Sequence, residues 1–164
     1  MAPKIPVFTI RKLTETDVPA MLQLCQTNPL YYQHMKIEPT LENLKQSMTT
    51  LPPGKTAEDK YFVGFFDNDR LAAILDLIVG YPRPEMAFIG WFILDKEYQG
   101  RGIGSQLVED ILARLRKFQY SAVRLGYIKT NPQSRAFWQK NGFVPTGQES
   151  QEEQYTVVIM EKTL

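Results

Sequence analysis

The sequence predicts a mixed α/β fold, with a largely antiparallel sheet of about seven strands flanked by about four helices. Three strand-like runs at 61–66, 71–79 and 86–94 follow one another closely, as in an antiparallel meander. A long amphipathic stretch at 102–118 precedes another strand-like run at 122–128. The run at 86–94, the helix at 102–118 and the run at 122–128 should therefore form one strand-helix-strand unit with parallel strands, which extends the meander. Crossovers of this kind are right-handed.

Length and composition favour one globular domain spanning residues 1–164. A chain of this size buries a core without disulfide or metal staples. Its 43% hydrophobic and 23% charged residues are ordinary for a globular protein. The 19 basic and 18 acidic residues leave a net charge of +1, so no overall field draws the protein to nucleic acid or to an anionic membrane.

The sequence shows no pattern of a membrane anchor, a disulfide or a metal cluster. Its most apolar run, 71–79, is too short to span a bilayer and is interrupted by Asp76. The single cysteine, Cys25, suits a reducing compartment and falls in the apolar pattern of a helix, as a small core residue. His34 stands alone, which argues against a zinc site. Since the N-terminus also lacks the apolar stretch of a signal peptide, we expect a cytoplasmic protein with no metal.

Strand, helix and loop are predicted in turn at the start of the chain. Residues 7–13 alternate well enough for a first strand. Thr14 or Thr16 then caps a helix that ends near Thr27. Residues 28–39 are predicted to form a loop rich in aromatic side chains.

The middle of the chain is punctuated by turn signals. Thr40 is expected to cap a second helix, and residues 51–60, which contain two prolines and a glycine, form a connection. The Asp-Asn-Asp sequence at 67–69 and the Pro-rich segment 80–84 are the two turns of the meander.

The C-terminal elements alternate between helix and strand. Apolar residues recur every fourth position through 102–118 and mark the long helix. A short helix is expected at 132–141, with Gly142 ending it. Residues 143–144 and 155–160 should supply the last strands.

Three glycines lie at the junction between a strand and the long helix: Gly100, Gly102 and Gly104. Without side chains there, backbone N–H groups can converge at a helix N-terminus, which is a natural site for phosphate or pyrophosphate. The alternative is a glycine turn needed only for tight packing. A Walker A loop is excluded because Ser105 stands where its Lys would be, and a dinucleotide fingerprint because Tyr120 stands where its acidic residue would be.

The chain resembles the Gcn5-related N-acetyltransferase (GNAT) superfamily over roughly residues 86–146. The loop Gln99-Gly100-Arg101-Gly102-Ile103-Gly104 matches the superfamily's Gln/Arg-x-x-Gly-x-Gly/Ala pattern. Downstream, Phe137-Trp138-Gln139-Lys140-Asn141-Gly142-Phe143 is similar to its usual Phe-Tyr-x-x-x-Gly-Phe. Two motifs at the family's separation are far more specific than either alone.

The resemblance implies a site for acetyl-CoA as co-substrate. The β-strand backbone at 92–94 would pair with the pantetheine arm, and backbone amides at 99–104 would hold the pyrophosphate. Arg101 would contact the 3′-phosphate or lie in solvent, and Asn131 would bind the cofactor, cap a helix, or do both. The implied cofactor-binding residues are Phe92, Ile93, Leu94, Gln99, Gly100, Arg101, Gly102, Ile103, Gly104, Ser105, Asn131 and Trp138.

Three positions depart from the catalytic residues of the superfamily. Trp138 stands where many members have a Tyr beside the CoA sulfur, and an indole N–H cannot act as a general acid. Trp138 could instead pack against the cofactor or belong to the core. Gly126 and Phe88 stand where two branches, one acetylating ribosomal-protein N-termini and one acetylating histones, have a Glu base. Both substrate classes are therefore disfavoured.

The remaining acid–base candidates are Asp76 and Tyr81. Asp76 interrupts an apolar strand, so it could bind the acceptor's ammonium or take its proton, or it could be a structural carboxylate with a partner. Tyr81 lies in a hairpin opposite the expected acceptor site. Tyr31, Tyr32 and Glu85 are the candidate substrate contacts, each with loop packing or solvation as the simpler role.

The resemblance thus implies an N-acetyltransferase that moves an acetyl group from acetyl-CoA to a primary amine of a small molecule or peptide. A catalytically silent CoA-binding sensor or interaction module is the alternative. Nucleic-acid binding through the basic residues between Arg114 and Arg124 fits poorly with the nearly neutral charge. Because dimers are common in this superfamily, a homodimer is one expected oligomeric state.

Overall fold

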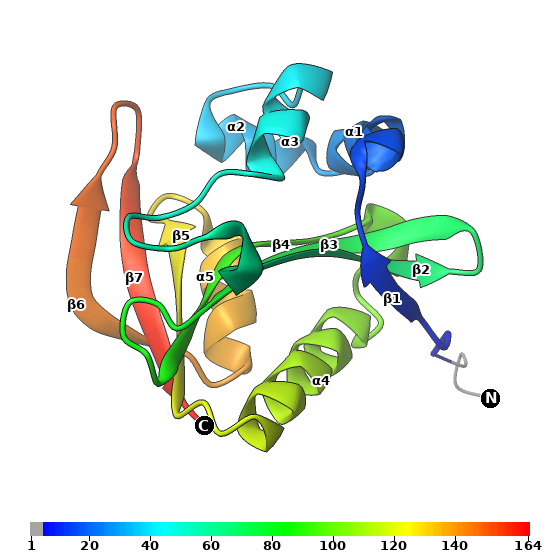
Figure 1. Cartoon of the computed structure of the whole chain (residues 1–164). Coiled ribbons are helices and arrows are strands. Elements are labelled where there is room, and N and C mark those ends of the chain that lie inside the picture. The colour runs from blue at the N-terminus through cyan, green and yellow to red at the C-terminus, as the bar shows by residue number, and fades with distance from the viewer. Residues whose placement is uncertain (1–4) are drawn as a thin grey trace.

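The computed structural model describes residues 5–164 as one twisted sheet with helices on both faces (Figure 1). The seven strands lie in the order β1-β2-β3-β4-β5-β7-β6, and every neighbouring pair is antiparallel except β4 and β5. The strands are β1 (Thr9–Lys12), β2 (Lys60–Asp67), β3 (Arg70–Val79), β4 (Met86–Leu94), β5 (Ala122–Ile128), β6 (Val144–Gln151) and β7 (Thr156–Thr163). The helices are α1 (Val18–Gln26), α2 (Pro29–Met35), α3 (Leu41–Ser47), α4 (Ile103–Lys117) and α5 (Pro132–Lys140). The predicted mixed fold with its parallel unit is confirmed.

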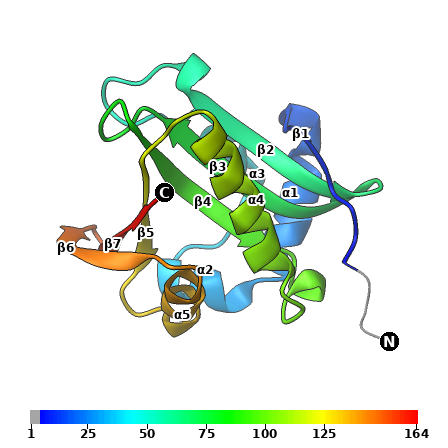
Figure 2. The same ribbon diagram turned by 90° about the horizontal axis from the view of Figure 1, so that it is seen from below.

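Two hydrophobic clusters sandwich the sheet. Helices α1, α2 and α3 cover one face, and α4 and α5 cover the other (Figures 1 and 2). On the α4 side, apolar residues spaced three and four apart on the helix are buried against the sheet. They are Ile103, Leu107, Val108, Ile111, Leu112 and Leu115. On the other side Met21, Leu24 and Leu44 of α1 and α3 pack on Ile74 and Ile93.

Local capping agrees with the sequence. Thr40 accepts a hydrogen bond from the Asn43 amide at the start of α3, as predicted. Thr14 caps a single 3-10 turn, and α1 itself begins at Val18. In the described residues 5–164, no helix is both long enough and apolar enough to span a bilayer.

Two sequence expectations were wrong. The segment predicted as loop at 28–39 contains α2, which has Pro29 at its first turn and buries Tyr32 in the cluster beneath α1 and α3. Tertiary packing therefore supplies a helix that the aromatic-rich sequence does not favour. The strand expected at 143–144 runs to Gln151, because β7 offers a ladder to an edge strand whose residues are nearly all exposed and show no apolar alternation.

The sheet opens between its two parallel strands. Pairing of β4 with β5 covers only Met86–Ile89 and Ala122–Leu125, while β5 continues alongside β7 to Ile128. On the other side of β4, Trp91 pairs with Asp76 and Ile89 with Leu77, so Gly90 is the extra residue of a β-bulge. The bulge and the loss of pairing coincide, which leaves backbone groups of 90–94 free on the β5 side.

Candidate functional site

The glycine loop forms an open backbone cradle at the N-terminus of α4. Gly100 and Gly102 have φ of +75° and +77°, a region that favours glycine, and Gly102 is the N-cap of the helix. A Cβ at either position would meet no atom within 4 Å, so the space in front of the loop is clear. Because the first amides of a helix have no intrahelical partner, the loop presents donors to an anion.

Side-chain hydrogen bonds anchor this loop to the sheet and to α2. The side-chain amide of Gln99 donates to the Leu94 carbonyl (2.7 Å) and to the side-chain oxygen of Asn28 (2.8 Å). Asn28 in turn donates to the same Leu94 carbonyl at 3.0 Å. The Lys96 amide donates to the Thr27 hydroxyl at 3.1 Å. The end of β4, the loop and the α1–α2 junction are therefore held together.

A cavity of about 410 Å³ runs from the glycine loop along the unpaired part of β4. It brings together residues from the end of β4, the loop, and α5, as the sequence predicts for a cofactor arm. Its lining comprises Asn28, Tyr31, Phe92, Ile93, Leu94, Gln99, Gly100, Gly102, Gly104, Ser105, Asn131, Gln133, Ser134, Phe137, Trp138 and Lys140. We call this the arm cavity.

Trp138 both packs in the core and lines the arm cavity. It is 7% exposed and makes edge contacts with Phe92, Phe137 and Phe143 at centroid distances of 4.9 to 6.1 Å. A Cβ on Gly104 would lie 3.0 Å from the Phe137 ring, so the third glycine of the loop permits close packing of α4 on α5. The two roles weighed for Trp138 are thus compatible.

Asn131 caps α5 at the wall of the arm cavity. Its side-chain oxygen accepts hydrogen bonds from the Gln133 and Ser134 amides at 3.1 and 3.2 Å. The residue is 5% exposed. The cap role is confirmed, and a cofactor contact remains a prediction for the rest of the side chain.

A smaller cavity of about 70 Å³ lies where β4 and β5 separate, and we call it the cleft cavity. Gly126 on β5 and Gly90 on β4 line it. A Cβ on Gly126 would lie 2.5 Å from Val157, so packing of β5 on β7 leaves no room there for the Glu of other superfamily members.

A third cavity, of about 250 Å³, continues on the α2–α3 side of β4, and we call it the acceptor cavity. Its lining comprises Tyr31, Tyr32, Met35, Ile37, Glu38, Pro39, Asn43, Leu44, Ser47, Thr50, Asp76, Gly90 and Trp91. Tyr31 lines all three cavities, which places its side chain where they meet. The arm, cleft and acceptor cavities therefore share walls from the glycine loop to Asp76.

Asp76 borders the acceptor cavity beside the bulge and is paired with Lys60. The Lys60 ammonium donates to Asp76 Oδ2 (3.1 Å) and to the Ser47 and Thr50 carbonyls (2.9 and 2.6 Å). Asp76 Oδ1 is buried and has no hydrogen-bond partner. Burial raises the pKa of the Asp76 carboxyl above its ordinary value, and the charge and hydrogen bond of Lys60 oppose this only in part.

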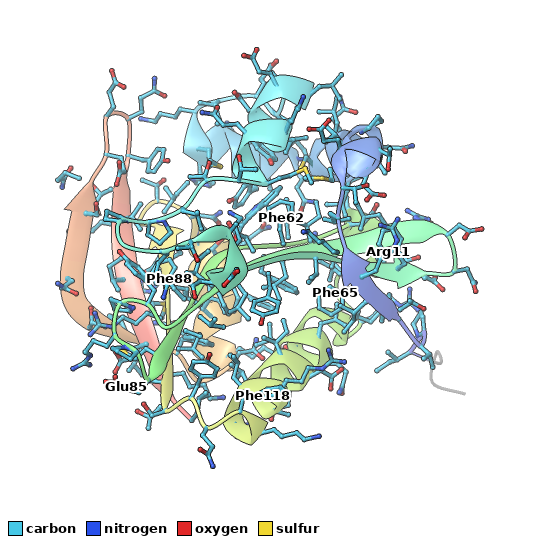
Figure 3. All side chains as sticks on the ribbon, in the orientation of Figure 1. Arg11, Phe62, Phe65, Glu85, Phe88 and Phe118 are labelled. Atoms are coloured by element: carbon cyan, nitrogen blue, oxygen red, sulfur yellow. The ribbon has the colours of Figure 1, made fainter. Side chains whose placement is uncertain are left out.

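Four of the predicted residues lie outside the walls of these cavities: Tyr81, Glu85, Arg101 and Ile103, whose side chain is buried in the core. Tyr81 stacks edge-on against Phe88 at 5.6 Å, and neither lines the three cavities. Glu85 is exposed beside Arg83, just before the start of β4, whereas the glycine loop follows the other end of that strand (Figure 3). Arg101 is exposed on the loop, outside the lining of the arm cavity. Tyr31, Tyr32 and Asp76 are the acceptor-side predictions that the structure brings together.

The model of the acetyltransferase (GNAT) family matches residues 22–143. This match spans the glycine loop, the opening between the parallel strands and every residue that lines the acceptor cavity. The chain belongs to the GNAT acetyltransferase family. A search of curated protein sequences found no match.

Solved structures of GNAT proteins share the fold over nearly the whole chain. An acetyltransferase from Thermus thermophilus has 24% identity and a TM-score of 0.78, covering 96% of this chain and 97% of that one. The PaiA N-acetyltransferase of Thermoplasma acidophilum, solved with coenzyme A, has 21% identity and a TM-score of 0.70 over 96% and 99%. A Salmonella typhimurium enzyme that modifies the N-terminal serine of ribosomal protein L7/L12 has 19% identity and a TM-score of 0.72 over 96% and 95%. At these identities the likeness establishes the GNAT fold.

The sequence did not point to Lys60, Gly90 or Glu38 as parts of this GNAT site. Lys60 begins a strand after a long connection, and only the fold brings it to Asp76. A glycine within the run 86–94 was the one available signal, because an isolated strand glycine indicates a bulge. Among the described residues, no group of three or more His, Cys, Asp or Glu is arranged to hold a metal ion.

Replacing Lys60 with Met should destabilise the protein by about 3–5 kcal/mol at pH 7, because a buried carboxylate and two carbonyls lose their partner. With its pKa already raised, Asp76 binds a proton more readily in the folded than in the unfolded chain. The Lys60→Met variant should therefore recover part of its lost stability as pH falls through the raised pKa of Asp76. Urea unfolding at pH 7 and at mildly acidic pH measures both effects.

Lys45→Met is the matched control. Lys45 is 62% exposed and lies 3.6 Å from Glu15, a surface pair worth less than about 1 kcal/mol. An equal loss of stability in the two variants would contradict the prediction, and so would a Lys60 variant whose stability does not depend on pH. Either result would show that the buried pair stabilises the protein no more than a surface pair does.

Proposed function

We propose that this GNAT protein is an N-acetyltransferase that moves an acetyl group from acetyl-CoA directly to a primary amine. The three adjoining cavities between the glycine loop and Asp76, which share lining residues, carry the proposal. They offer an anion site at one end, an extended arm along β4, and an amine site at the other.

The residues present fit the chemistry of coenzyme A. The amides of the loop at 99–104 would hold the pyrophosphate at the N-terminus of α4. Beyond Ile89, the unpaired backbone of β4 would bind the amide groups of pantetheine as an added strand would. Lys140 at the lining of the arm cavity adds a cation for the phosphates. Trp138 would pack against the thiol end of the arm.

In the proposed reaction Asp76 takes the proton of the substrate ammonium, directly or through water. The free amine then attacks the thioester carbonyl, a C–N bond forms, and the C–S bond breaks. Unpaired β4 amides beyond the bulge would stabilise the developing oxyanion. The departing thiolate needs a proton, and Tyr31 is the candidate donor because its side chain borders all three cavities. Burial raises the pKa of Tyr31, which keeps its hydroxyl protonated between turnovers.

A silent CoA-binding module would share the loop and the arm cavity. Trp138 in place of the usual Tyr keeps that alternative open. The carboxylate of Asp76 beside the bulge favours an enzyme, since a module without turnover has no use for a buried, imperfectly satisfied acid at this place. Turnover of acetyl-CoA with any amine separates the two.

Acetyl-CoA and CoA should raise the melting temperature of the protein, while ATP should not. A ligand at 100 times its Kd stabilises the folded state by about 2.7 kcal/mol, which corresponds to about 5–10 °C for a domain of this size. Differential scanning fluorimetry measures the shift, and release of the CoA thiol with an amine present measures turnover. No shift at millimolar CoA would contradict the proposal at its base, and a shift without turnover would favour the silent module.

A further inference from the structure

The lining of the acceptor cavity is acidic and apolar. It contains two carboxylates, Asp76 and Glu38, and neither lysine, arginine nor histidine. The remainder is apolar or neutral. What such a cavity selects follows from where its charges lie, provided that the proposed acetyl transfer takes place at its inner end.

The two carboxylates belong to different parts of the cavity. Asp76 is on β3, and a Cβ added at Gly90 would lie 3.1 Å from its Oδ2, so it borders the bulge where the cleft cavity begins. Glu38 is exposed and lies on the connection between α2 and α3, so it forms the solvent side. Lys60 compensates the charge of Asp76. Glu38 therefore supplies the net negative charge of the cavity.

The other walls of the acceptor cavity suit methylene groups and cations. Tyr31 and Trp91 present aromatic rings, and Met35 and Leu44 add aliphatic surface. Aromatic faces attract an ammonium group as well as an alkyl chain. The volume of about 250 Å³ exceeds that of an engineered cavity of ~150 Å³ that binds benzene, so a short chain has room.

We infer that the acceptor is a linear aliphatic diamine or polyamine. One amine lies at Asp76 and is acetylated, the methylenes lie along the aromatic walls, and the second ammonium pairs with Glu38. The reaction converts R–NH₃⁺ and acetyl-CoA into R–NH–CO–CH₃, CoA thiol and one released proton. Of the two protons that leave nitrogen, one ends on the thiol sulfur and one passes through Asp76 to solvent.

The same lining disfavours amines that carry a carboxylate. A free amino acid would place its negative group near Asp76 or Glu38, with no cation on the lining to pair with it. Juxtaposed like charges cost several kcal/mol and exclude wrong partners. A monoamine keeps the wall contacts and loses only the pair with Glu38.

Two acceptors of equal size test the inference. 1,4-Diaminobutane and pentylamine have the same number of non-hydrogen atoms and differ by one ammonium in place of a methyl group. Initial rates of CoA release should give a kcat/KM about two- to fivefold higher for the diamine, because Glu38 is exposed and an exposed ion pair is worth up to about 1 kcal/mol. Glu38→Gln should remove that preference by lowering kcat/KM for the diamine about two- to fivefold and leaving pentylamine unchanged.

Glu42→Gln is the matched control, because it removes the same exposed charge from the adjacent helix without touching the cavity lining. It should leave both acceptors unaffected. Equal kcat/KM for the two amines, a better rate with glycine, or an equal effect of Glu38→Gln on both would overturn the inference while acetyl transfer stands. Absence of both a CoA-induced thermal shift and turnover with any amine overturns the proposed function, and the diamine inference with it.

Discussion

Gly102→Glu should abolish binding of CoA while the protein stays folded. The new carboxylate would lie at the α4 N-terminus, in the place that the proposal gives to the pyrophosphate. Like-charge juxtaposition costs several kcal/mol, and each 1.4 kcal/mol is about tenfold in Kd. Affinity should therefore fall at least ~100-fold. Isothermal titration with CoA measures the loss, and circular dichroism checks the fold.

A second glycine with the same geometry tests whether backbone strain alone could cause the loss of CoA binding. Gly102 has φ of +77° and Gly147, on β6, has φ of +92°, and a Cβ at either would meet nothing within 4 Å. Both substitutions add one negative charge and cost about 1–2 kcal/mol of strain. Gly147→Glu should leave the Kd for CoA unchanged. Unchanged binding in the Gly102 variant would instead mean that the loop is only a turn.

Asp76→Asn should lower kcat/KM for acetyl transfer by about 10²-fold or more, the usual contribution of a general base. Affinity for CoA should stay near normal, because Asp76 does not line the arm cavity. The introduced amide oxygen can still accept from Lys60, so the fold should survive. Steady-state rates and CoA titration on the same preparation separate the two quantities.

The pH dependence of this variant distinguishes a base from a structural carboxylate. Only the ionised carboxyl accepts a proton, so wild-type kcat/KM falls as pH drops through the pKa of Asp76. That pKa is raised by burial, so the acidic limb lies above the ordinary range of an Asp. The Asn variant should lack this limb. Asp110→Asn, on the surface of α4, is the control, and an intact limb in the Asp76 variant would assign it to another group.

Most of the fold could be predicted from periodicity in the sequence. The strands β4 and β5 begin and end at the predicted residues, and α4 differs by one residue at each end, because each carries its signal within itself. The failures at α2 and β6 have the opposite cause. Both elements depend on partners elsewhere: α2 on packing against its neighbouring helices, and β6 on the ladder with β7.

The candidate site divides in the same way. The glycine loop at the N-terminus of α4 was predictable because its six residues are consecutive and lead directly into the helix, so its geometry is local. Nothing local connects Lys60 to Asp76, which lie on different strands, or places Tyr31 where the cavities meet. Tyr81 and Glu85 were plausible acceptor-side candidates by sequence position alone, and the fold places them away from the cavities.

The sequence by itself determined the mixed α/β fold, the GNAT resemblance and the glycine loop at the start of α4, because hydrophobic periodicity and glycine conformations act over a few residues. Only the tertiary structure decided the acceptor side. There α2 and α3 come together with β3 and β4, which follow much later in the chain, at the bulge at Gly90 where the sheet opens. Charge pairing and burial in that cavity depend on distances between distant segments, which no local pattern encodes.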